Sequence, residues 1–407
     1  MASRTCFALL VGVVLAFSAA SSTQAQVAAP VLYGSDGSDL ARAQALYQAG
    51  DPVVRKTVQA IITDADKALD LPSLSVVNKK FSPPSGDKHD YASLSPYWWP
   101  DPSKPDGKPY IRRDGEFNPE RAEYDLDPME KMSRGVERLA MAYYFTRDEK
   151  YAAKAAELLR TWFLRPETRM NPNFKYAQFV PGYDKPRPSG IIEGNRLSKV
   201  IDGVGLLAGS ANWSSDDDAG VRKWFGEFKD YLLTSEQGRA EAAQPNNHGT
   251  WYAVQVGTYA LFAGHTEDAR KLIEEAFKQR INSQIKPDGS QPEEMVRTLS
   301  LHYHRYNLLA LVELASLGDR VGLDLWNYKT ADGRSIRTAI DYLIPYFLEE
   351  KAWEGKQIRP ANYGDFVIIA RRAANAFNDP EYAQVAQRLQ EKHSREMVDL
   401  LFPARQP

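Results

Sequence analysis

The feature that most constrains the fold is a helical pattern that recurs along the chain. Three segments share an apolar helix end, a short polar turn and the start of a second amphipathic helix: Ala142–Leu159, Tyr259–Phe277 and Ala374–Leu389. In these helices the apolar residues recur at the spacing that places them on one face. Asp and Thr side chains accept hydrogen bonds from the free backbone N–H groups of a first turn. The expected N-caps of the second helices are therefore Asp148, Thr266 and Asp379.

Recurring helical hairpins predict an all-α fold. Stacked helix pairs bury a shared core, either in an open solenoid or in an α/α toroid. Lys131–Thr146 and Glu149–Leu164 are two such helices, and good strand signals are few. Two long loops rich in Pro, Gly and aromatic residues, Phe81–Pro119 and Asn171–Gly190, interrupt the pattern, and loops of this length are usually functional. We therefore expect one domain over residues 26–407, with the loops lining a groove on one face.

Residues 1–25 have the pattern of an export signal. Arg4 supplies the positive start, and the apolar run Cys6–Ala19 is shorter than a bilayer span requires. Small residues follow, up to a cleavage site at Ala25, with an uncleaved anchor as the alternative. Cys6 is the only cysteine, so the mature protein is expected to have no disulfide bond. The sequence thus predicts a secreted or periplasmic protein.

The candidate site lies in two aromatic-rich segments that contain three of the six histidines. The first segment, Gln244–Tyr252, opens a predicted helix that runs to Ala263. Its candidates are Asn247, His248 and Trp251. The second segment, Ser290–Asn307, contains Glu293, Glu294, Arg297, His302, Tyr303, His304 and Tyr306.

These side chains suit the cleavage of a uronic-acid polymer by β-elimination. The reaction removes the C5 proton beside the carboxylate, so an amide and a guanidinium are needed to neutralise that carboxylate and stabilise the enolate-like transition state. A base must take the C5 proton, and an acid must protonate the departing O4. The two segments contain one amide, one guanidinium, one imidazole and one phenol for these tasks: Asn247, Arg297, His248 and Tyr303. This chemistry requires no metal or other cofactor.

The same residues carry a resemblance to a known family. The pair Asn247-His248, followed by Pro292–Arg297 and Leu301–His304, resembles the alginate lyase family of polysaccharide lyases, and the glucuronan-cleaving relatives look closer still. The loop Tyr97–Pro102 is similar to another motif of these proteins. The resemblance implies an incomplete α/α toroid and metal-free β-elimination of uronates. By the same resemblance, the matching residues are two carboxylate neutralisers, Asn247 and Arg297, a base, His248, and an acid or combined base and acid, Tyr303.

The spacing of Arg297 departs from the alginate-cleaving members, in which the Arg precedes the Tyr by two helical turns. Here Arg297 precedes Tyr303 by six positions. Six positions turn about 600° around a helix and do not return to the same face. Arg297 is therefore expected before the helix, whose N-cap is predicted to be Thr298 or Ser300. This favours the glucuronate-cleaving branch or a broader specificity.

The stereochemistry of the sugar decides how many residues must act. In glucuronate and mannuronate the C5 hydrogen and O4 lie on the same side of the ring, so Tyr303 alone can be base and then acid. In guluronate they lie on opposite sides, so His248 would be the base opposite Tyr303. We expect His248 and Tyr303 to face one cleft, and the Arg297 cation to lower the pKa of Tyr303.

Other functions fit weaker patterns. An inverting glycoside hydrolase on an α/α toroid would use two carboxylates, such as Glu293 and Asp365, but gives the Asn, His, Arg and Tyr group no role. A non-catalytic sugar-binding scaffold would need only the aromatic loops. A zinc site at His302 and His304 is disfavoured, because residues two apart on a helix face different ways and no Asp or Cys completes the ligand set.

An anionic polysaccharide is the expected partner of this chain. The formal net charge of −2 argues against a general nucleic-acid binder, but a groove can still be locally basic. Trp98 and Trp99 are expected to stack on sugar rings or to pin their loop. The other predicted substrate-binding residues are Arg196, Trp251, His304 and Tyr306. We expect a monomer that contacts neither nucleic acid nor, after signal removal, a membrane.

Overall fold

The computed structural model describes residues 29–183, 185–393 and 397–404. The export signal predicted for residues 1–25 lies outside this part of the chain. No helix within it combines the length and the apolar character that a membrane span requires.

Helices make up most of the described chain. In the first half they are α1 Gly37–Ala49, α2 Pro52–Leu69, α3 Leu126–Thr146, α4 Glu149–Leu159, α5 Ser198–Leu206, α6 Ser215–Thr234 and α7 Glu236–Ala242. In the second half they are α8 Asn247–Phe262, α9 Thr266–Gln284, α10 Pro292–Met295, α11 Ser300–Arg320, α12 Ile336–Phe347, α13 Gly364–Phe377, α14 Pro380–Lys392 and α15 Val398–Leu401. Short helical turns lie at Val76–Asn78, Pro119–Glu123, Arg160–Leu164 and Pro188–Leu197.

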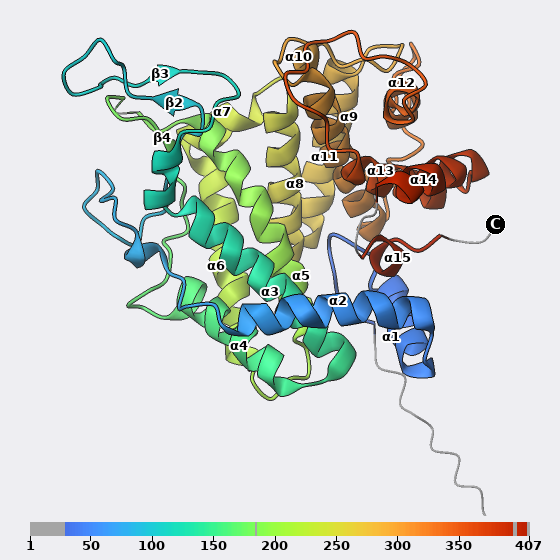
Figure 1. The fold of residues 1–407 in the computed structure, drawn as a ribbon, viewed down its shortest axis with the longest axis horizontal. Helices are drawn as coiled ribbons and strands as arrows, with labels where there is room; N and C mark the ends of the chain where they lie inside the picture. Colours follow the sequence, from blue (N-terminus) through green and yellow to red (C-terminus); the bar gives the residue numbers. More distant parts are fainter. Residues whose placement is uncertain (1–28, 184, 394–396, 405–407) are drawn as a thin grey trace, which may run out of the picture.

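The helices pack as the predicted incomplete α/α toroid (Figure 1). Helix α3 contacts α2, α4 and α5, helix α8 contacts α6, α9 and α11, and α13 contacts α14. The recurring sequence pattern corresponds to three of these hairpins, α3–α4, α8–α9 and α13–α14. The all-α prediction is thus confirmed.

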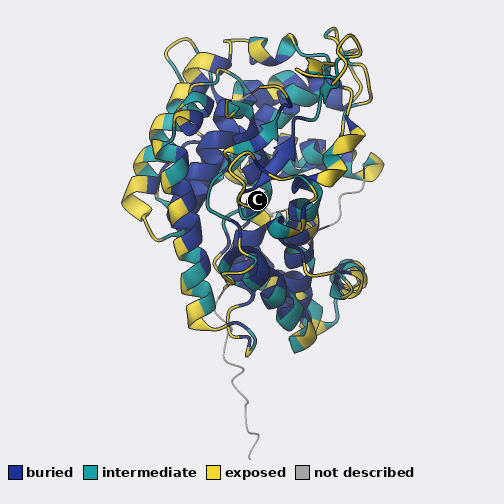
Figure 2. Cartoon of the chain, turned by 90° about the vertical axis from the view of Figure 1, so that its left-hand side faces the viewer, coloured by how far each residue is buried: buried dark blue, intermediate teal, exposed yellow. Residues whose placement is uncertain are grey.

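The central helix of the toroid is α8. Every residue of this helix except His248 is buried, as expected of a core helix. One side joins the apolar cluster of the first half of the chain through Tyr252, Val256, Tyr259 and Phe262. The other side joins the cluster of the second half through Trp251, Ala253, Val254, Ala260 and Leu261. Figure 2 shows this buried interior with an exposed periphery. The first turn of α8, which carries Asn247 and His248, is therefore firmly placed.

Two of the three predicted N-caps are confirmed. The Asp148 side chain accepts from the backbone N–H of Lys150, and that of Asp379 from the N–H of Glu381. The prediction for Thr266 is wrong by one residue, because His265 occupies the N-cap position of α9. The N–H of His265 bonds back to the carbonyl of Ala260 and thereby closes α8, so the next helix begins directly after it.

Four short strands lie in the two long loops, and one pair of them joins the loops. In the parallel pair, β1 (Ala92–Leu94) lies beside β4 (Tyr176–Phe179). In the antiparallel pair, β2 (Trp98–Trp99) lies beside β3 (Ile111–Arg112). Since β4 belongs to the second loop and the other strands to the first, the loops are joined at the end of the molecule where α7 leads into α8 (Figure 1).

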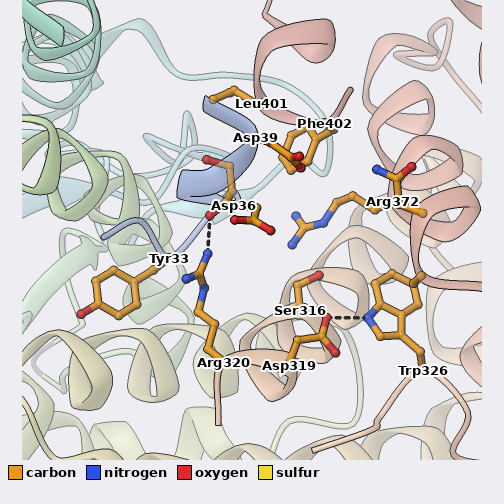
Figure 3. Close-up of a pocket in the computed structure, with 13 residues that line it drawn as sticks. Tyr33, Asp36, Asp39, Ser316, Asp319, Arg320, Trp326, Arg372, Leu401 and Phe402 are labelled. Carbon is orange, nitrogen blue, oxygen red and sulfur yellow. Dashed lines mark hydrogen bonds between the residues drawn. The ribbon is translucent and has the colours of Figure 1, made fainter. Parts of the chain in front are cut away.

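A cavity of about 270 Å³ lies at the other end of α11. Its lining includes Asp319 and Arg320 from the last turn of that helix, together with Trp326. The indole N–H of Trp326 donates to Asp319 at 3.1 Å, and Arg320 binds the carbonyl of Ser35 (Figure 3). At a rise of about 1.5 Å per residue, Asp319 lies about 24 Å along the helix from Tyr303. This cavity is therefore remote from the residues that the sequence selects.

Candidate active site

The candidate residues meet where three helices begin, at the top of Figure 1. Asn247 and His248 form the first turn of α8, α10 follows on from the end of α9, and Tyr303 lies in the first turn of α11. Asn246 caps α8, because its side-chain oxygen accepts from the backbone N–H of His248 at 3.1 Å. The fold thus brings the two sequence segments to one end of the toroid.

His248 is held by a buried carboxylate. Its Nδ1 atom lies 2.6 Å from Oε1 of Glu241, a residue of α7 that is fully buried. A carboxylate accepts, so Nδ1 is the donor, and the neutral form of the ring has its lone pair on Nε2. The side chain of His248 remains 21% exposed. Glu241 therefore fixes the orientation of the His248 ring through Nδ1 and leaves Nε2 as the nitrogen that can accept a proton.

Asn247 is fully buried and bound to a second carboxylate. Its backbone N–H donates to Oε1 of Glu294 at 2.6 Å, and its Nδ2 atom lies 3.0 Å from both Oε1 and Oε2. Burial raises the pKa of Glu294, against the opposing effects of Asn247, Arg297 and His248. Asn247 is thus hydrogen-bonded to a carboxyl group that is largely removed from solvent.

Arg297 lies between α10 and α11, as its spacing predicted. Its guanidinium carbon is 3.7 Å from the centre of the Tyr303 ring, and an NH2 nitrogen is 3.9 Å from Asp114. Asp114 also accepts from the Thr298 hydroxyl at 2.7 Å. The long loop that carries the double Trp therefore reaches over this part of the site.

The N-cap predicted for α11 is wrong. The cap position is held by Leu299, which makes no side-chain cap bond. The hydroxyl of Ser300 is committed elsewhere, because it donates to the carbonyl of Lys356. The hydroxyl of Thr298 is likewise used by Asp114.

The pKa of Tyr303 moves opposite to expectation. Burial raises the pKa of this phenol, and Tyr97 and Asp114 add to the increase, whereas Arg297 lowers it. The contribution of Arg297 has the predicted sign but is outweighed by desolvation. Tyr303 is consequently protonated at rest, which is the form that a general acid needs.

Charges and contacts link all four predicted catalytic residues. Arg297 and His248 both lie close enough to Glu294 to lower its pKa, Asn247 bonds directly to Glu294, and Arg297 covers the Tyr303 ring. An imidazole, a phenol, a guanidinium and a buried amide therefore lie in one part of the molecule.

Three of the predicted substrate-binding residues line one cavity of about 740 Å³: Arg196, Trp251 and Tyr306. The rings of Trp251 and Tyr306 are 5.0 Å apart, and the Tyr306 hydroxyl accepts from Asn195 at 2.6 Å. The His302 ring stacks on Tyr306 at 5.9 Å and meets Tyr303 at 5.2 Å. His302 therefore connects Tyr306, at one edge of the cavity, with Tyr303. The described lining of the cavity includes none of the four predicted catalytic residues and extends along α11 to Leu317.

Three of the predicted substrate-binding side chains already have a partner within the protein: Arg196, Trp98 and Trp99. The guanidinium of Arg196 is paired with Glu130. The face of Trp98 is covered by Arg187 at 4.8 Å, and that of Trp99 by Arg113 at 5.2 Å. Both Trp residues help to fix the hairpin, and each places a cation beside an aromatic surface.

The structure corrects the assignment of His304 as a substrate-binding residue. Its side chain is fully buried against Tyr342 and Trp353. Its Nδ1 donates to the carbonyl of Ser300 at 2.9 Å, while Nε2 accepts from the N–H of Gln291 at 3.3 Å. Burial lowers the pKa of His304 to about 4. His304 is a neutral core residue that joins two segments of the site.

The two carboxylates proposed for a hydrolase lie in different environments. Asp365 forms an ion pair with Arg305, and Glu293 is exposed. Among the described residues, no group of three or more His, Cys, Asp or Glu side chains could hold a metal ion.

The sequence patterns did not indicate three residues that support the site: Glu241, Asp114 and Asn195. Glu241 binds His248, Asp114 binds Thr298, and Asn195 binds Tyr306.

The chain matches known proteins over most of its length. The alginate lyase family model matches residues 75–353. An alginate lyase from Bacteroides ovatus superposes with a TM-score of 0.88 and 36% sequence identity, covering 92% of this chain and 99% of that one. No curated protein sequence matches this chain.

More distant structures share the fold alone. Alginate lyase A1-III from Sphingomonas species A1 has a TM-score of 0.50 at 18% identity, covering 86% of this chain and 95% of that one. A variant of that enzyme in complex with a tetrasaccharide has a TM-score of 0.53 at 16% identity, covering 91% and 95%.

The chain therefore belongs to the alginate lyase family. It is an enzyme, a polysaccharide lyase on an α/α toroid, and neither a glycoside hydrolase nor a non-catalytic scaffold.

Proposed function

We propose that this enzyme cleaves an O4-linked uronic-acid polymer of the alginate or glucuronan type by metal-independent β-elimination. Two contacts carry the proposal: Asn247 bonds to Glu294, and the Arg297 cation covers the Tyr303 ring. The charges of Arg297 and His248 also act on Glu294, whose pKa they lower. A uronate bound there would meet an amide, a guanidinium, a base and an acid.

The reaction balances with these groups alone. A base removes the C5 proton, and its electron pair forms the C4–C5 double bond while the C4–O4 bond breaks. Arg297 and Asn247 stabilise the charge that develops on the carboxylate. The protonated phenol of Tyr303 gives its proton to the departing O4. The products are a new reducing end and a 4,5-unsaturated uronate.

The identity of the base depends on the sugar. With its Nδ1 proton bonded to Glu241, His248 has Nε2 free to take a C5 proton that lies opposite O4, as in guluronate. For mannuronate or glucuronate, Tyr303 must first lose its proton in order to act as base and then acid. Arg297 favours that ionisation, whereas burial opposes it.

We further propose that the enzyme acts outside the cytoplasm as a monomer. The apolar run that follows Arg4 supports export, and long polyuronates are substrates that meet a cell from outside.

A panel of mannuronate, guluronate and glucuronate polymers tests the activity. The purified enzyme is expected to produce the ultraviolet absorbance of a 4,5-unsaturated uronate from at least one of them. Reducing ends that accumulate without this absorbance would instead show hydrolysis. The ranking of the three polymers gives the preferred sugar.

Exhaustive chelation is expected to leave turnover unchanged, because a guanidinium and an amide neutralise the carboxylate. The rate is measured on the best polymer before and after dialysis against chelator. Activity that disappears and returns with a single divalent ion would contradict the proposed mechanism.

A further inference from the structure

Within the part of the chain that the structure describes, only one of the two polar atoms of the Asn247 carboxamide, the nitrogen, has a hydrogen-bond partner. Its nitrogen lies 3.0 Å from both oxygens of Glu294, and its backbone N–H donates to Oε1. Its own Oδ1 atom is buried and has no hydrogen-bond partner among the described residues. An unpaired buried carbonyl oxygen destabilises the folded protein, so its place next to the candidate site needs an explanation.

This arrangement conflicts with the task of Asn247. If Glu294 is ionised it can only accept, so it holds the amide nitrogen and leaves the amide oxygen as the unpaired atom. An amide oxygen repels a substrate carboxylate, which also accepts only. Neutralising the uronate requires the NH2 group at the position that Oδ1 occupies when Glu294 is charged.

We propose that Glu294 is a positioning residue that works in its protonated form and turns the Asn247 amide toward the substrate. Oε1 of Glu294 continues to accept the hydrogen bond from the backbone N–H of Asn247. The protonated Oε2 of Glu294 donates to the side-chain Oδ1 of Asn247. The amide NH2 group then faces the uronate carboxylate. The inference rests on the proposed function, because it assumes that a uronate binds at Asn247.

The surroundings of Glu294 agree with this role. Its side chain is 1% exposed, and burial raises its pKa. The charged groups that face it are His248 on α8, itself paired with Glu241 of α7, and Arg297 after α10. Both His248, when protonated, and Arg297 favour the ionised form. A bound uronate adds a negative charge beside Glu294 and favours the proton, so substrate binding and protonation are coupled.

The sign of the coupling gives a pH dependence. Glu294 supports binding only while it is protonated, so affinity is complete below its pKa and is lost as the pH rises through that value. Above it, KM is expected to increase about tenfold per pH unit, as loss of one coupled proton requires. Glu294→Gln is expected to abolish this slope, because its amide donates permanently to Asn247. Glu293→Gln, on the exposed neighbour, is the matched control and should keep it.

Binding can be measured without turnover in the Tyr303→Phe background. Titration with an alginate tetrasaccharide in buffers of different ionisation enthalpy should show uptake of up to one proton per ligand. The uptake should disappear with Glu294→Gln and persist with Glu293→Gln. The inference is overturned if Glu294→Gln keeps the wild-type slope of KM and the proton uptake, or if it loses activity as completely as Glu294→Ala. A wild-type enzyme that gives no unsaturated product from any polyuronate refutes the proposed function instead.

Discussion

Replacing Tyr303 by phenylalanine is expected to abolish cleavage of every polyuronate, with kcat lower by about 10²–10⁴-fold or more. The phenol is the acid that the proposed mechanism assigns to O4, and O4 cannot leave readily as an alkoxide. The ring itself is retained in the variant, so the contact with the Arg297 cation at 3.7 Å should survive. The loss should therefore appear in kcat and not in KM. Initial rates from the ultraviolet absorbance of the product measure both constants.

The control for this change is Tyr342→Phe, since Tyr342 packs against the buried ring of His304 away from the reacting groups. Near-normal turnover by Tyr303→Phe on the best polymer would refute the assignment. The next candidate would then be Tyr306, whose hydroxyl accepts from Asn195 beside the large cavity.

The hairpins were predictable because their signal is local. In Ala142–Leu159 the apolar spacing, the polar turn and the Asp148 cap all lie within a few residues of one another, and the structure has all three. The closure of the hairpins into a toroid has no such local signal in the sequence. It depends on contacts such as those of α8 with α6 and α11, which no short pattern encodes. The N-cap error at Thr266 reflects the same limit, because the end of one helix decides where the next begins.

The site was predictable in part for a similar reason. Helical geometry placed Arg297 before α11, and chemistry selected both Asn247, which bonds to Glu294, and Tyr303, whose ring Arg297 covers. Burial could not be read from the sequence. It reverses the expected pKa shift of Tyr303 and places His304 in the core. The support of His248 by Glu241 also depends on how α7 folds against α8.

His248→Ala is expected to lower kcat by about 10²–10⁴-fold on guluronate linkages and by less on mannuronate or glucuronate. Only guluronate requires a base on the side of the ring opposite to Tyr303. Glu241→Gln should show the same preference with a smaller loss, because it weakens the hydrogen bond that holds Nδ1 at 2.6 Å. Initial rates on polymers rich in each sugar give the ratio of guluronate cleavage to mannuronate or glucuronate cleavage for each variant.

The matched control for the histidine is His265→Ala, at the exposed N-cap position of α9, which should leave the ratio between the polymers unchanged. An equal loss on all polymers would mean that His248 takes part in every reaction, for instance by holding the uronate carboxylate. No loss on any polymer would remove it from the mechanism. A loss confined to guluronate would show that one site uses two bases, with the sugar deciding which of them receives the proton.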